Sequence, residues 1–151
     1  MSQKYALPIF LAGTTTQASY TRWLGRKSVA HVRRDKKRGN TIATNEAYKM
    51  AIHRAVLQSD GRDDYTGELL DWSLISRYNN AASKEMRRPY KASFALLPTV
   101  DHVGEGLGAV DFKICSRRTN DAKHELTHIE FVELCRRVVA HFDGRSVPNC
   151  R

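Results

Sequence analysis

Apolar residues recur at helical spacing in three segments of the chain. From Ser19 to Lys37, Tyr20, Trp23 and Leu24 fall on one face, which predicts an amphipathic helix. Thr44 is placed to cap a second helix, Asn45 to Gln58, and Thr127 with Glu130 forms the capping-box pattern of a last helix. The buried stripes expected on these two helices are Tyr48, Ala51, Ile52, Ala55 and Val56, then Phe131, Leu134, Cys135, Val138 and Phe142.

Two short segments follow the pattern of strands. Phe94 to Val100 is an apolar run interrupted by Pro98, which is typical of an edge strand. Residues 111–116 alternate apolar and polar positions, and glycines 104, 106 and 108 lie between the two runs. Ser116 or Thr119 can then cap a short helix that breaks near Leu126, with Asn120 in its first turn.

Three other segments have weaker patterns. Residues 5–12 predict a short strand or an extended tail, and residues 78–91 a polar, irregular stretch. Residues 63–68 read as a turn whose carboxylates make local hydrogen bonds, rather than as a metal site. His53 and Arg54 lie off the centre of the apolar stripe, so surface positions are expected for both.

Together these elements predict a small α+β domain that uses the whole 151-residue chain. Its expected parts are a helical, basic region over 1–62, a core of two strands and helices over 63–142, and a tail over 143–151.

Charge indicates the kind of partner. The chain has 25 Lys and Arg against 16 Asp and Glu, a formal net charge of +9, which favours a polyanion such as nucleic acid. A basic run near the end of the first predicted helix contains Arg33, Arg34, Lys36, Lys37 and Arg38. It is either an arm along a nucleic-acid backbone or a solvated helix end, and we favour the arm. Arg87 and Arg88 lie beside Tyr90, a combination that suits phosphate contact by the arginines and base stacking by the tyrosine. An ordinary exposed loop is an equally good interpretation of these residues.

The cysteines Cys115, Cys135 and Cys150 have no metal-binding spacing, so we expect no structural zinc. Cys115 and Cys135 fall at apolar positions and are expected to be buried free thiols, which fits a reducing, cytoplasmic location. The first apolar stretch is too short for a membrane span and makes a poor signal peptide, so no membrane partner is expected.

Asp101, His102 and Asn120 have the chemistry needed for phosphodiester hydrolysis. A carboxylate and an amide oxygen suit Mg²⁺, which usually takes one or two protein ligands together with substrate phosphate. A histidine beside them can accept the proton of an attacking water, since its ordinary pKa lies near neutrality. We therefore predict that these three side chains meet around one divalent ion.

The run Val100-Asp101-His102, followed by a Phe-Lys-Ile-Cys strand and Asn120, resembles the HNH endonucleases, also called ββα-metal or His-Me finger nucleases. The resemblance covers residues 97–142, and residues 64–70 are similar to the segment that precedes the motif in many such enzymes. It implies a ββα-metal core and a hydrolase that cuts nucleic acid, with double-stranded DNA as the expected substrate and Mg²⁺ or Mn²⁺ as cofactor.

The resemblance also implies residue roles. Asp101 and Asn120 would be metal ligands and His102 the general base. The family's final histidine has two candidates, His124 and His128; His124, one helical turn past Asn120, is expected to be a third ligand or a phosphate contact. The cations expected to hold neighbouring phosphates are Arg117, Arg118 and Lys123. The alternative is a catalytically inactive nucleic-acid-binding module of the same fold.

Overall fold

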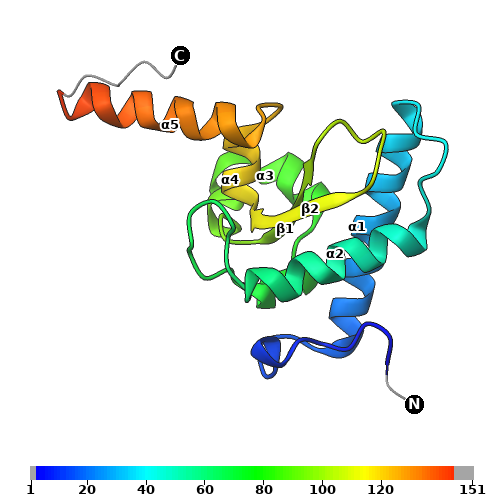
Figure 1. Ribbon diagram of the computed structural model, residues 1–151. Coiled ribbons are helices and arrows are strands. Elements are labelled where there is room, and N and C mark those ends of the chain that lie inside the picture. Colours follow the sequence, from blue (N-terminus) through cyan, green and yellow to red (C-terminus); the bar gives the residue numbers. More distant parts are fainter. Residues whose placement is uncertain (1–2, 145–151) are drawn as a thin grey trace. The chain divides into compact units, whose positions relative to one another are not determined.

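The computed structural model describes residues 3–144 and has mixed α+β structure, as the sequence predicts. The chain forms two compact units, Met1–Asp121 and Ala122–Arg151 (Figure 1). The elements, in order, are η1 (Ile9–Leu11), α1 (Gln17–Lys37), α2 (Asn45–Ser59), η2 (Trp72–Ser76), α3 (Asn80–Ser93), β1 (Pro98–Val103), β2 (Asp111–Ser116), α4 (Arg117–Lys123) and α5 (His128–Phe142).

Helices α1 and α2 each supply four buried side chains to the core of the first unit. Both begin at threonine caps, where Thr16 accepts a hydrogen bond from the Ser19 amide and Thr44 one from the Ala47 amide. The predicted apolar face of α1 is buried, and Trp23 meets Trp72 of η2 edge to face with ring centroids 5.3 Å apart. The two predicted helices are therefore confirmed to within two residues at each end.

Strands β1 and β2 form an antiparallel hairpin in which Asp101 pairs with Lys113 and His102 with Phe112. β1 begins four residues later than the predicted strand and ends three residues later, so Asp101 and His102 lie inside it rather than after its end. Because successive residues of a strand point to opposite faces, the side chains of Asp101 and His102 diverge. The strand itself therefore does not bring Asp101 and His102 to one ion.

Two other segments differ from expectation. Residues 5–12 contain the short 3₁₀ helix η1 instead of a strand. The stretch expected to be irregular contains α3, capped by Asn79 and interrupted at Arg87, whose φ is 51°. Pro89 explains the break, because its ring and missing N–H are incompatible with an uninterrupted helix.

The second unit begins at Ala122 and contains α5. Its predicted capping box is confirmed: the Thr127 side chain accepts from the Glu130 amide, and the Glu130 carboxylate accepts from the Thr127 amide. The predicted burial of its apolar stripe is wrong for the described residues, since Phe142 is 84% exposed and none of α5 is buried. Cys135 is likewise exposed, whereas Cys115 is buried as expected; Cys150 and most of the predicted tail lie outside the described residues.

Across residues 3–144, no helix combines the length and the apolar character needed to span a membrane.

Candidate functional site

The site is built around the β1–β2 hairpin, whose two faces have different surroundings. His102, Val100, Phe112 and Ile114 share one face, and Val100, Phe112 and Ile114 belong to the core. Asp101 lies on the other face, together with Thr99 and Cys115. The two residues predicted to act side by side are thus placed in different environments by the pleat of one strand.

His102 is held by a buried carboxylate of α1. Its Nε2 lies 2.7 Å from Oδ2 of Asp35, and the Tyr48 hydroxyl donates to the same oxygen at 2.5 Å. Burial, and then the hydrogen bond to Asp35, raise the pKa of Tyr48, so the phenol stays protonated and remains a donor. Only 7% of the His102 side chain is exposed. Asp35 therefore fixes the orientation of the imidazole from inside the core.

The glycine-rich loop after β1 packs against Asp35. A Cβ added at Gly106 would lie 2.7 Å from Oδ1 of Asp35, and φ at Gly106 is +77°. The Asn40 side chain donates to the Gly106 carbonyl at 2.7 Å and holds the loop there. Gly106 is required here both by its backbone conformation and by its close approach to Asp35.

His31 completes the buried polar cluster. Its ring lies 6.1 Å from that of His102 and 5.0 Å edge to face from that of Phe112. Burial, reinforced by the positive charge of Arg34, lowers the pKa of His31 to about 3, so it is neutral at pH 7. Within residues 3–144, the buried atoms Nδ1 of His31, Nδ1 of His102 and Oδ1 of Asp35 have no hydrogen-bond partner.

On the opposite face, Asp101 is buried and accepts a hydrogen bond from the Tyr65 hydroxyl at 2.5 Å. Burial and this contact raise the pKa of Tyr65. Tyr65 belongs to the acidic turn, the name used here for residues 63–68.

The acidic turn joins β1, β2 and α4. Asp63 is buried, and its carboxylate accepts from the amides of Tyr65 and Ser116 at 2.8 Å and from the Thr119 hydroxyl at 2.7 Å. Although burial opposes ionisation, these hydrogen bonds lower the pKa of Asp63, so it is charged at pH 7. The predicted local turn bonds are present, and the longer-range bonds to β2 and α4 add a bracing role that the sequence did not reveal.

Asn120 lies in α4, directly after Thr119, and is partly buried. Ser116 caps the helix as predicted, since its side chain accepts from the Thr119 amide at 3.0 Å. The helix ends at Lys123, three residues earlier than expected, and φ at His124 is +51°. The helical spacing that placed His124 on the face of Asn120 therefore does not apply, and its role as a ligand stays a prediction.

Among residues 3–144, no group of three His, Cys, Asp or Glu side chains could hold a metal ion. The predicted ligand set has two residues of these types, Asp101 and His124, and its third donor is the amide oxygen of Asn120. One carboxylate with one amide fits Mg²⁺, which keeps most of its water shell. The donor chemistry of Asp101 and Asn120 therefore suits this ion. His102 is not part of this donor set, because its side chain is turned toward Asp35.

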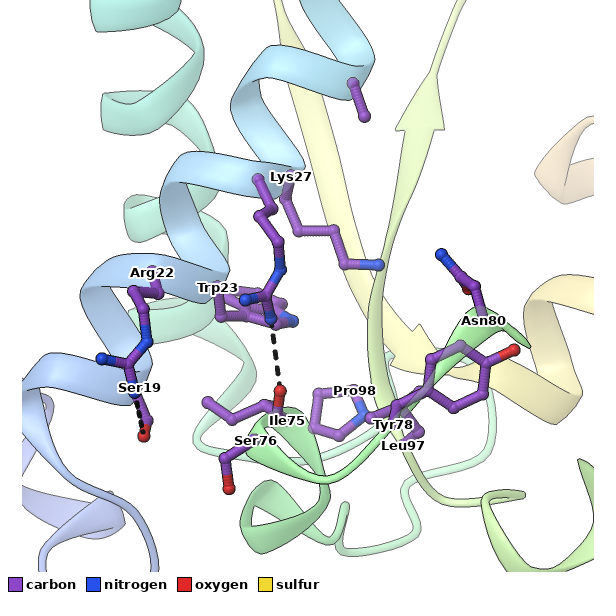
Figure 2. Close-up of a pocket in the computed structure, with 12 residues that line it drawn as sticks. Ser19, Arg22, Trp23, Lys27, Ile75, Ser76, Tyr78, Asn80, Leu97 and Pro98 are labelled. Atoms are coloured by element: carbon purple, nitrogen blue, oxygen red, sulfur yellow. Dashed lines mark hydrogen bonds between the residues drawn. The ribbon is translucent and has the colours of Figure 1, made fainter. Parts of the chain in front are cut away.

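A basic cavity of about 460 Å³ opens beside β1 (Figure 2). Arg22, Arg26 and Lys27 of α1 line one side, and Figure 2 shows Lys27 reaching from α1 toward the strand. The Lys27 amine donates to the Thr99 hydroxyl at 3.0 Å. Burial, and then the charge of Arg26, lower the pKa of Lys27 to about 8. An anion in this cavity would relieve the repulsion among these cations.

The predicted nucleic-acid contacts differ in accessibility. The basic run on α1 is exposed, as are Arg87 and Arg88. Arg118 is exposed and bonded to Glu68 of the acidic turn at 2.6 Å. Lys123 is buried, which is unfavourable for direct contact with a backbone phosphate.

Sequence reasoning missed four residues of the site: Asp35, Tyr48, Tyr65 and Lys27. A signal existed for two of them, because Lys27, His31 and Asp35 repeat every four residues along one face of α1. His53 was also misplaced on the surface: it is partly buried, and its Nδ1 lies 2.7 Å from the Tyr20 hydroxyl.

Comparison with known proteins finds no matching family model, no matching curated protein and no matching solved structure.

Proposed function

We propose that this chain is a divalent-metal-dependent endonuclease of the HNH type that hydrolyses phosphodiester bonds in DNA. The observation that carries the proposal is the β1–β2 hairpin leading directly into α4, with Asp101 in the first strand and Asn120 in the helix. The same acidic turn bonds to both parts, through Tyr65 to Asp101 and through Asp63 to Thr119. The net charge of +9 supports a polyanionic substrate.

In this proposal Asp101 and Asn120 would hold Mg²⁺ or Mn²⁺, and the ion would supply positive charge to the scissile phosphate. Asp35 positions the imidazole of His102, and the hydrogen bond from Tyr48 holds Asp35 in place. His102 would accept the proton of the attacking water at Nδ1, the ring nitrogen that is not bonded to Asp35. This step requires a local rearrangement of β1, because the His102 side chain lies on the face opposite Asp101. Nδ1 is buried, so the rearrangement must also expose this nitrogen to water.

The basic cavity of Figure 2 and the exposed α1 cations provide the binding surface for the phosphate backbone. Phosphate contacts of this kind position a strand without reading its sequence.

A second candidate function is a catalytically inactive nucleic-acid-binding module. The burial of His102 favours it, since an imidazole that is only 7% exposed has little access to water or substrate.

Nicking of closed circular plasmid DNA separates the two functions. The endonuclease predicts nicking that requires Mg²⁺, stops with EDTA, and is lost in Asp101→Asn and Asn120→Ala. Glu105→Gln, which changes an exposed carboxylate of the glycine-rich loop, is the matched control and should retain activity. Because His102 is buried, His102→Gln is compared with wild type by thermal melting before its activity is interpreted.

Salt-sensitive DNA retention without nicking, unchanged by Mg²⁺ or Mn²⁺, would reject the enzyme and support the binding module. Nicking that persists in both Asp101→Asn and Asn120→Ala would reject the proposed metal ligands.

A further inference from the structure

A second basic cavity, of about 430 Å³, lies within the first unit between α3 and the start of α4. We call it the α3–α4 pocket, and its lining residues are Ser83, Lys84, Arg87, Arg88, Lys91 and Arg117. Five of these six residues are cationic and none is acidic. Such a concentration of like charge is unfavourable unless an anion is present to offset it.

Arg117 is the most constrained of these cations. Its guanidinium carbon lies 4.6 Å from the centroid of the Tyr78 ring, and its side chain is only 17% exposed. Nε is 3.6 Å from the exposed carboxylate of Asp121, while Nη1 is buried and has no hydrogen-bond partner within residues 3–144. A buried guanidinium N–H without an acceptor is rare, and a bound oxyanion would supply one.

The backbone of α3 is also unusual at this cavity. Arg87 has φ 51° and ψ −126°, a combination that residues other than glycine seldom adopt. The break separates Lys84 from Arg88 and Lys91, yet all three line the cavity. An unfavourable backbone conformation of this kind, at a cavity with unbalanced charge, is typical of a binding site.

We propose that the α3–α4 pocket binds a phosphomonoester, the terminal phosphate of a nucleic-acid strand. A terminal phosphate carries a charge of about −1.5 to −2 at pH 7, against −1 for an internal phosphodiester, and it suits five cations better. Guanidinium groups also pair with its oxygens through parallel hydrogen bonds. The identity of the polymer rests on the proposed function, whereas the phosphate chemistry rests on the pocket alone.

The test compares the affinity of the full chain for one short oligonucleotide carrying either a 5′-phosphate or a 5′-hydroxyl. EDTA is present, so that no cleavage occurs. We expect the phosphorylated strand to bind about tenfold more tightly, the ratio given by one charge-assisted hydrogen-bonded contact. Inorganic phosphate should compete with the phosphorylated strand and reduce this ratio.

Arg88→Gln and Arg117→Gln should each bring the two affinities close together. Arg54→Gln, which removes an exposed cation of α2 outside this pocket, is the matched control and should keep the ratio. Arg88 is exposed, so its substitution tests the pocket even where Arg117→Gln lowers stability.

Equal affinity for the two strands, or a ratio that both pocket variants leave unchanged, would overturn the proposal. Closed circular DNA has no terminal phosphate, so plasmid nicking is independent of this result. Plasmid nicking with equal affinity for the two oligonucleotides would refute only the phosphate-binding pocket. Tighter binding of the 5′-phosphorylated strand without plasmid nicking would refute only the proposed nuclease function.

Discussion

Replacement of Asp63 tests whether the acidic turn holds the site together. Its carboxylate accepts four hydrogen bonds, from the amides of Tyr65, Thr66 and Ser116 and from the Thr119 hydroxyl. In Asp63→Ala, the buried Ser116 amide and Thr119 hydroxyl both lose their charged acceptor. A lost hydrogen bond to a charged group costs about 1.5–3 kcal/mol, so the loss of these two should lower the free energy of unfolding by about 3–6 kcal/mol.

Asp63→Asn separates the charge from the shape. In the wild type, Oδ1 of Asp63 accepts from the two turn amides and Oδ2 accepts from Ser116 and Thr119. In Asp63→Asn, one of these oxygens becomes an NH₂ group, which is itself a donor and must face two other donors. We expect a loss of about 2 kcal/mol even though the volume is unchanged. The matched control is Asp64→Asn, at an exposed carboxylate that accepts from the Ile114 amide, with an expected loss below about 1 kcal/mol.

The assay is urea unfolding followed by circular dichroism at pH 7, with the denaturant slope checked for constancy. The Asp63 pKa is lowered in the folded state, so its stabilisation is present above its ordinary value of 3.8 and is lost as the pH falls below it. Asp63→Asn should remove that part of the acid sensitivity. A loss for Asp63→Ala no larger than that for Asp64→Asn would refute the bracing role.

Three further predictions concern the buried cluster. Gly106→Ala should lower the melting temperature more than Gly104→Ala. Both glycines have positive φ, but only a Cβ at Gly106 would contact Asp35. Equal decreases in melting temperature would contradict this close approach. The His31 pKa of about 3 lies below its ordinary value of 6.5, so below pH 6.5 the unfolded chain binds a proton that the folded chain does not. The contribution of His31 to the free energy of unfolding should therefore be complete above pH 6.5 and fall by about 2 kcal/mol by pH 5, since each pH unit is worth about 1.36 kcal/mol. Urea unfolding of His31→Phe, which cannot titrate, should lack this loss, and an unchanged pH profile would reject the assignment. Tyr48→Phe removes a donor to the Asp35 carboxylate, so it should cost about 1.5–3 kcal/mol and lower nicking activity. Full activity would exclude a role for the Tyr48 hydrogen bond in holding Asp35.

The elements that depend on local chemistry could be read from the sequence. The Thr44 cap, the Thr127–Glu130 capping box and the bounds of β2 are all as predicted, because each depends on residues within a few positions of one another. The sequence pattern predicted irregular structure where α3 lies, because Pro89 inside the segment argues against a continuous helix and apolar residues are few there.

The surroundings of the candidate site were decided by tertiary structure. The sequence pointed to Asp101, His102 and Asn120 as residue types in order. Because β1 continues to Val103, Asp101 and His102 face opposite sides of the strand. Asp35 lies 67 positions from His102 and Tyr65 lies 36 from Asp101, and no local pattern links them. The packing of α1 and of the acidic turn against the hairpin brings these partners together. This packing depends on burial and hydrogen bonding over the whole fold, so the sequence alone indicated the chemistry of the site but not its geometry.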